Sequence, residues 1–195
     1  MSEDPHIISS LIDLCRSMRI QCIVQVGAAE GDEVARIQEA IGCHAVAIEA
    51  RPEVLPASFN IDFHYTVIGA TDGVTEFYVH PSGELSGHFP RVDGGEEKIT
   101  EKQQRLDTFC FNNRLLPDAL IIDTEGTTLE VLEGAGRVLD TVRLIYAECQ
   151  TVKSHPDMRL LKEVDDFLVD RGFVRREGLP AYSVGAQGNY CWVKT

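Results

Sequence analysis

Three acidic residues in the middle of the chain, Asp123, Glu125 and Glu148, have the types and positions needed to move a proton. Asp123 directly follows the apolar run 120–122, and Glu148 follows the apolar run 144–147, so both should end strands. Acids that meet at one sheet edge could deprotonate a hydroxyl group, or hold a divalent cation that lowers the pKa of that hydroxyl. We assign the three acids as catalytic candidates. We assign no metal ligands, because nothing else in the sequence supports a cation.

Each acid also has a structural interpretation. Glu125 precedes Gly126 and a predicted helix, so its carboxylate could cap that helix. Glu148 could make a structural hydrogen bond at the end of its strand. His88 and His155 are alternative bases, since both fall in predicted loops from which they could reach an acceptor molecule.

A second group of residues has the pattern of a nucleotide cradle. The apolar run 20–26 ends in the turn 27–31, helix 32–41 follows, and strand 44–48 closes on Glu49. In such a unit the glycines allow close approach of the backbone, the helix start offers free N–H groups, and the acid accepts hydrogen bonds from ribose hydroxyls.

The composition of this turn argues against a pyrophosphate ligand. Ala29 stands where the dinucleotide fingerprint G-x-G-x-x-G has its second glycine, and Glu30 adds negative charge. Both features disfavour NAD and FAD, and the chain has no G-x-x-x-x-G-K-[ST] phosphate loop. A ligand with a ribose, a cationic centre and no phosphate fits better, as in S-adenosylmethionine (SAM).

The elements that must position these residues alternate between strands and helices, which predicts an α/β fold with a largely parallel sheet covered on both faces. Ligands of such sheets bind beyond the carboxyl ends of the strands. We predict that 63–68 enters a hairpin with 74–79 and that the last two strands are antiparallel. The predicted helices cover 5–15 (capped at Asp4), 32–41, 107–114 (capped at Asp107), 127–135 and 157–171, and the strands cover 20–26, 44–48, 63–68, 74–79, 99–106, 120–122, 144–147, 173–175 and 190–193.

Length and charge limit the class of protein. The 195 residues suit one domain, with an N-terminal helix within 1–19 and a mobile substrate loop at 81–98. A formal net charge of −13 would repel nucleic acid and anionic lipid, so neither is expected as a partner. The sequence contains no apolar run long enough to span a membrane, we expect no leader, and the six cysteines form no C-x-x-C pair. We therefore expect a cytoplasmic protein, with a homodimer as one option.

Seven short blocks, in this order, resemble the FkbM family of SAM-dependent methyltransferases. The resemblance spans about residues 20 to 150, and its most specific part is Leu-Asp, then Ile-Asp-x-Glu-Gly, then Leu-x-Gly. The blocks are Val-Gln-Val-Gly-Ala-Ala-Glu-Gly (24–31), Ile-Glu-Ala-Arg-Pro (48–52), Gly-Ala-Thr-Asp-Gly (69–73), Arg-Leu-Asp-Thr (105–108), Ile-Ile-Asp-Thr-Glu-Gly (121–126), Val-Leu-Glu-Gly-Ala (131–135) and Ala-Glu-Cys (147–149).

The resemblance implies a class I methyltransferase fold, which is Rossmann-like and three-layered, with a mostly parallel seven-stranded sheet and an extra β-hairpin. It also implies methyl transfer from SAM, usually to a hydroxyl oxygen of a small molecule or glycan. Asp123 and Glu125 would sit where cofactor and acceptor meet. The implied cofactor-binding residues are Gln25, Gly27, Ala28, Glu30, Glu49, Ala50, Arg51, Ile68, Gly69, Ala70 and Asp123.

One position departs from the family pattern. An acid usually stands two residues before the first glycine, where this chain has Gln25. The missing charge could come from Glu30 or Asp123. The alternative is a catalytically silent SAM-fold module that serves as a binding or regulatory partner. The last 45 residues match no motif and could select the substrate.

Overall fold

The structure is a computed structural model of the 195-residue chain, and it describes every residue except 1–4, 59, 82–85, 91–94, 178–182 and 185. The predicted helix cap at Asp4 therefore lies outside the described residues, as does part of the predicted loop 81–98. None of the described helices is long and apolar enough to cross a membrane.

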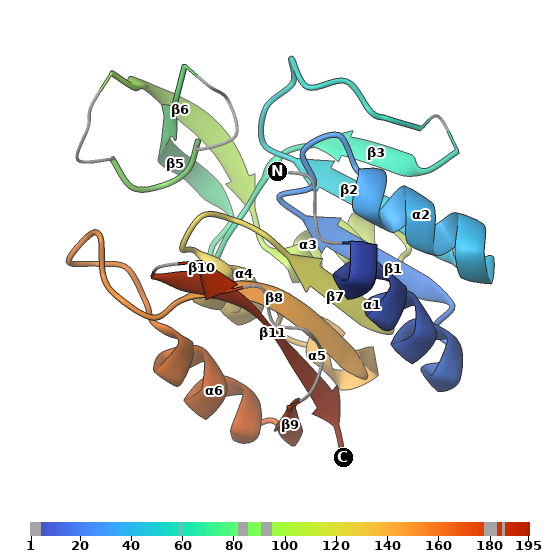
Figure 1. The fold of residues 1–195 in the computed structure, drawn as a ribbon. Helices are drawn as coiled ribbons and strands as arrows, with labels where there is room; N and C mark the ends of the chain where they lie inside the picture. The colour runs from blue at the N-terminus through green and yellow to red at the C-terminus, as the bar shows by residue number, and fades with distance from the viewer. Residues whose placement is uncertain (1–4, 59, 82–85, 91–94, 178–182, 185) are drawn as a thin grey trace.

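A twisted central sheet forms the middle layer of the fold (Figure 1). Its strands are β1 (Cys22–Val26), β2 (His44–Glu49), β3 (Asp62–Tyr65), β7 (Ala119–Ile122), β8 (Leu144–Gln150), β9 (Phe173–Arg176), β10 (Ser183–Val184) and β11 (Gln187–Lys194). They follow the order β10-β11-β8-β7-β1-β2-β3, and β9 also pairs with β11. The pairs from β8 to β3 are parallel, whereas those of β11 are antiparallel. The predicted mostly parallel arrangement is confirmed, with seven strands along this path among the described residues and β9 as an eighth strand beside β11.

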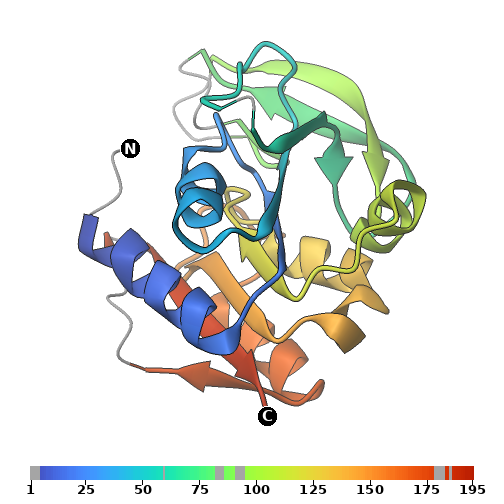
Figure 2. The same ribbon diagram turned by 90° about the vertical axis from the view of Figure 1, so that its right-hand side faces the viewer.

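Helices cover both faces of this sheet, as Figure 2 shows from the side. One face carries α1 (Pro5–Met18) and α2 (Asp32–Ile41). The other face carries α3 (Leu106–Asn113), α4 (Thr128–Ala135), α5 (Val138–Thr141) and α6 (Leu161–Val169). These are the three layers that the sequence predicts.

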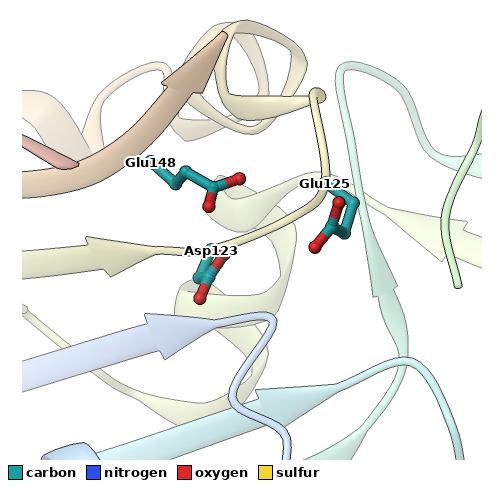
Figure 3. A group of neighbouring side chains, drawn as sticks. All are labelled: Asp123, Glu125 and Glu148. Carbon is teal, nitrogen blue, oxygen red and sulfur yellow. The ribbon is translucent and has the colours of Figure 1, made fainter. Parts of the chain in front are cut away.

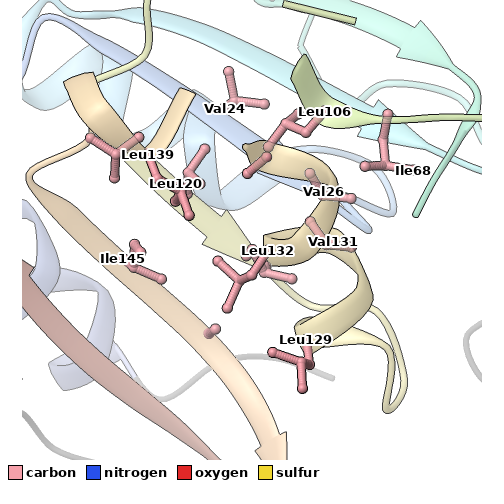
Figure 4. Close-up of a cluster of buried hydrophobic side chains, with 14 of the residues drawn as sticks. Val24, Val26, Ile68, Leu106, Leu120, Leu129, Val131, Leu132, Leu139 and Ile145 are labelled. Carbon is pink, nitrogen blue, oxygen red and sulfur yellow. The ribbon is translucent and has the colours of Figure 1, made fainter. Parts of the chain in front are cut away.

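The strands are apolar on both faces because each face packs against helices. In β1, Val24 and Val26 point into the core with α3 to α6, while Ile23 points toward α1 and α2. Figure 4 shows the first of these cores, to which Leu120 and Leu132 also belong. All five of these side chains are at most 3% exposed, so the strand ends are fixed firmly beneath the site.

A small second sheet replaces the predicted long third strand. The prediction of one strand over 63–68 is wrong, because the chain leaves the central sheet at Thr66, whose N–H donates to the carbonyl oxygen of Glu49 (2.9 Å). The second sheet has the order β4-β6-β5, made of β4 (Val67–Ile68), β5 (Gly73–Val79) and β6 (Glu97–Gln104). The hairpin exists, but β5 pairs with β6 and not with the third strand.

Other predicted details also differ from the structure. Residues 97–98 of the predicted loop belong to β6. The last long helix begins at Leu161, because Leu160 is extended and bridges to Gln150 of β8. Asp107 does not cap its own helix; its carboxylate accepts the backbone N–H groups of Arg137 and Val138 (3.0 and 2.9 Å), at the start of the unpredicted α5.

Candidate active site

A cavity of about 1110 Å³ lies at the carboxyl ends of β1, β2, β7 and β8. This is the edge at which parallel α/β sheets bind ligands. Gly69 and Ala70 are not part of its lining; the Gly69 N–H donates to Gln104 O instead (3.1 Å). The other predicted residues all line the cavity: Gln25, Gly27, Ala28, Glu30, Glu49, Ala50, Arg51, Ile68, Asp123, Glu125 and Glu148.

The turn after β1 brings the cradle against the end of β7. Gly27 has a φ of 73°, in the left-handed region that favours glycine. A Cβ at this position would overlap the carbonyl oxygen of Asp123. The N–H groups of Gly27 and Ala28 both donate to the carbonyl oxygen of Ile48 (2.9 and 3.1 Å). The turn, β2 and β7 are therefore locked together at one point of the cavity wall.

Glu49 is a buried carboxylate held in a fixed orientation, with its side chain 8% exposed. One of its oxygens accepts the Ala29 N–H (2.8 Å) and the other accepts the Arg51 N–H (3.1 Å). The Arg51 guanidinium approaches the same carboxylate at 3.4 Å. Both Arg51 groups approach Oε1, whereas the oxygen that accepts the Ala29 N–H keeps a second lone pair, so Glu49 can still accept a hydrogen bond from a ligand hydroxyl. This geometry fits the predicted ribose contact.

Glu49→Gln is expected to weaken the binding of a ribose-containing cofactor about 10-fold, because charged acceptors form the stronger hydrogen bonds. In addition, the glutamine N–H₂ group would face the backbone N–H of Ala29 or Arg51, and two donors cannot form a hydrogen bond with each other. Calorimetric titration with S-adenosylhomocysteine (SAH) measures the change. Glu39→Gln is the control, since Glu39 is exposed on α2 and is not part of the cavity lining. If wild type and Glu49→Gln bound SAH with equal affinity, Glu49 would not contribute to cofactor binding.

The structure brings the three acidic residues together (Figure 3). Asp123 follows β7, Glu125 lies two residues further on, and Glu148 lies within β8, which continues to Gln150 instead of ending at Ala147. One carboxylate oxygen from each of the three lies within 4.8 Å of the others. Such a set could share a proton, and its hard oxygen donors would also suit a divalent cation.

The local backbone explains how Glu125 reaches this group. Glu125 has a φ of 45°, unusual for a residue with a side chain. Gly126 follows with a φ of 93° and packs against Met158. The N-cap residue of α4 is Thr127, so Glu125 does not occupy the capping position suggested as its structural role.

Glu148 does have the structural hydrogen bond considered for it. One oxygen accepts the side-chain N–H of Gln187 at 2.9 Å, and the other accepts from Gln150 at 3.4 Å. Both donors come from the sheet, so they orient the carboxylate toward Asp123 and Glu125. Structural support and a role in the cavity are thus compatible.

Electrostatics make two of these acids better bases than ordinary carboxylates. Burial raises the pKa of Glu148, and the charges of Asp123 and Glu125 raise it further. Asp123 opens onto the cavity but is surrounded by protein, and this desolvation raises its pKa, with a smaller contribution from Glu49. A carboxylate with a raised pKa holds a proton more strongly, which suits the removal of a proton from a hydroxyl group.

The raised pKa of Glu148 predicts a pH-dependent stability. The folded protein binds this proton more tightly than the unfolded chain does, so stability falls as pH rises through the folded-state pKa. Glu148→Gln should reduce this loss of stability with rising pH. Its melting temperature at pH 8–9 should therefore be roughly 2–4 °C higher than that of wild type. Thermal melts from pH 5 to pH 9 measure this, with exposed Glu39→Gln as control. Parallel curves for wild type and Glu148→Gln would contradict it.

Strand β5 and the segment that follows it also contribute to the cavity, through Phe77 and His88. His88 lines the cavity and contacts Phe77 edge-on, with ring centroids 5.8 Å apart. Burial lowers the His88 pKa, so its imidazole is neutral at physiological pH. His155 stacks on Phe89 (4.9 Å) and is not part of the lining. The sequence indicated His88 as a candidate only because it lies in a long predicted loop. No local pattern predicts that this part of the loop lines the cavity.

Comparisons with known proteins agree with this architecture. Rv0187 from MTB, solved with a cofactor bound, has a TM-score of 0.61 at 10% identity, over 99% of this chain and 81% of that chain. The N-terminal domain of EvdMO1, solved with SAH bound, has a TM-score of 0.55 at 12% identity, over 100% and 82%. An O-methyltransferase family protein from Burkholderia thailandensis has a TM-score of 0.54 at 10% identity, over 97% of this chain and 55% of that longer chain. At these identities the likeness shows the fold alone.

The sequence comparisons identify the family. No curated protein matches the chain. The methyltransferase FkbM domain matches residues 25–175, which include the glycine turn and all three acids. The chain therefore belongs to the FkbM methyltransferase family.

Proposed function

We propose that this protein transfers a methyl group from SAM to a hydroxyl oxygen of a small molecule or glycan. The observation that carries the proposal is that the cradle at Gly27 and Glu49 and the acid group at Asp123, Glu125 and Glu148 line one cavity. A cofactor held by the first would have its reactive end beside the second. Family membership supports the methyl transfer, and the acids support a hydroxyl acceptor.

The cofactor would be held mainly by fixed groups. Glu49 would bind the ribose hydroxyls, and the turn 27–31 would lie along the rest of the nucleoside. When bound, SAM supplies a methyl group activated by its sulfonium. The chain contributes by alignment, because a displacement of this kind depends chiefly on the distance and angle between the reacting atoms.

The acid group would prepare the acceptor. Asp123 or Glu148 would accept the proton of the hydroxyl, and Glu125 would orient that hydroxyl by hydrogen bonding. The neighbouring carboxylates keep the proton within the group once it has moved. The acceptor would be neutral or cationic, because the net charge of −13 and these acids repel anions.

Product profiling tests the proposal. Purified protein is incubated with SAM carrying a labelled methyl group and with fractionated small-molecule extracts, and labelled products are identified by mass spectrometry. We expect a labelled methyl ether that releases no methanol on mild alkaline treatment. A labelled methyl ester, amine or protein would contradict the hydroxyl acceptor, and the absence of any product would favour the silent module.

A further inference from the structure

A second, smaller cavity of about 410 Å³ lies at the amino ends of β1, β2 and β3, at the sheet edge opposite the cofactor cavity. Cys22, His44 and Asp62 line it, and each is the first residue of its strand. By the alternation of side chains along the strands, all three lie on the sheet face that carries α3. The end of α3 adds Asn113 and Arg114 to the lining. None of these residues takes part in the proposed methyl transfer.

The three strand residues form a row of contacts with His44 at its centre. Cys22 is paired with His44 in the sheet register, and Cys22 Sγ lies 3.9 Å from His44 Nδ1. On the other side of the ring, His44 Nε2 lies 2.6 Å from Asp62 Oδ2. An ionised carboxylate can only accept, so Nε2 carries the hydrogen, and in the neutral ring Nδ1 keeps its lone pair on the side of the thiol. Asp62 therefore orients the ring so that a nitrogen and a sulfur ligand lie side by side.

Cys22 differs from the other cysteines in its surroundings. The structure describes all six, and only Cys22 is not buried. The Asp118 carboxylate accepts its backbone N–H (3.0 Å), which fixes the start of β1. Partial burial raises the pKa of the Cys22 thiol to about 11, with a contribution from Asp118, so a free thiolate nucleophile is not expected here. The His44 side chain is 47% exposed, so an ion can reach the pair from solvent.

We propose that Cys22 and His44 form a binding site for Zn²⁺, with Asp62 as the residue that positions His44. Zinc binds cysteine sulfur at about 2.3 Å and histidine nitrogen at about 2.0 Å, so two such ligands of a tetrahedral ion are roughly 3.6 Å apart. The distance of 3.9 Å between Sγ and Nδ1 is close to this value. Metal-bound histidines usually donate their other ring N–H to a carboxylate, as His44 does to Asp62.

The pair supplies two of the four ligands. Within the part of the chain that the structure describes, no third histidine, cysteine or acid brings a ligand atom within 4.8 Å of both, so water fills the other positions. The bound ion displaces the thiol proton to solvent. No metal ligand was expected from the sequence, because Cys22, His44 and Asp62 are separated by 22 and 18 positions and form no short motif. The site is independent of the proposed methyl transfer.

Cobalt titration tests the site in the wild-type protein. Co²⁺ is added to chelator-treated protein, because a cobalt–thiolate bond gives a near-ultraviolet charge-transfer absorption that oxygen ligands do not give. The acid group at the other sheet edge is therefore silent in this measurement. We expect the absorption to saturate at one equivalent and to be removed by competing Zn²⁺. No such absorption at millimolar Co²⁺, or one that does not saturate, would overturn the site whether or not the protein binds SAM.

Variants shown to be folded by circular dichroism identify the residues responsible. Cys22→Ala should abolish the absorption. Cys43→Ala should keep it, because Cys43 is buried and is not part of the lining. Asp62→Ala should weaken Zn²⁺ binding about 10- to 100-fold, the usual effect of losing the carboxylate behind a metal-bound histidine. Asp13→Ala is the control, since the Asp13 side chain is 76% exposed on α1 and outside this cavity. Retention of the absorption in Cys22→Ala, or unchanged Zn²⁺ affinity in Asp62→Ala, would contradict the assignment.

Discussion

Asp123→Asn is expected to lower the rate of methyl transfer about 10²–10⁴-fold, the usual contribution of a positioned general base. Asparagine keeps the size of the side chain but cannot accept the proton. Binding of SAH should change much less than the rate, because asparagine keeps an acceptor oxygen at this position. Desolvation by the surrounding cavity walls raises the Asp123 pKa, so the variant should also melt at a higher temperature than wild type at pH 8. Initial rates with labelled SAM and differential scanning calorimetry measure both effects.

The control for Asp123→Asn removes the same charge elsewhere. Glu133 is exposed on α4 and is not part of the cavity lining. Glu133→Gln should keep the wild-type rate. If Asp123→Asn turned over at the wild-type rate, the base would have to be another group, and His88 would be the first to test.

Gly27→Ala is expected to destabilise the fold by about 2–4 kcal/mol and to abolish cofactor binding in the measurable range. The residue has a φ of 73°, and its new Cβ would overlap the backbone carbonyl oxygen of Asp123. Relief of that overlap requires the β1 turn and the end of β7 to move apart. Both the cradle and the acid group would then be displaced. Chemical denaturation and SAH titration measure the two effects.

Gly42→Ala provides a matched control for Gly27→Ala. Gly42 has a nearly identical φ of 72°, but a Cβ there would meet nothing within 4 Å. It ends α2, away from the cavity lining. This variant therefore carries the backbone strain without the overlap, and should cost only about 1 kcal/mol with SAH binding intact. Equal effects of the two substitutions would show that the close approach at Gly27 does not matter.

The sequence allowed the layers and the cofactor edge of the fold to be predicted because these depend on local patterns. The run 20–26, the glycine turn and helix 32–41 each have their own signal, and parallel strands end at a common edge. For the same reason Gly27, Glu49 and Asp123 could be assigned to one cavity before their distances were known.

The parts that could not be predicted depend on contacts between distant segments. The strand expected at 63–68 is interrupted at Thr66, because β4 pairs with β6, which lies more than 30 residues later in the sequence. Asp107 was expected to cap its own helix but binds backbone N–H groups about 30 residues away. Glu33 lines the cavity and accepts a hydrogen bond from the Gln25 side chain, and no pattern in the sequence predicts that contact.

The central claim is that the cavity at the carboxyl ends of β1, β2 and β7 binds the SAM cofactor. Isothermal titration calorimetry of the purified protein with SAH tests it most directly. We predict saturable binding of one ligand per chain in the micromolar range, weakened by Glu49→Gln and absent in Gly27→Ala. No heat of binding at millimolar SAH, with the protein shown to be folded, would contradict the claim.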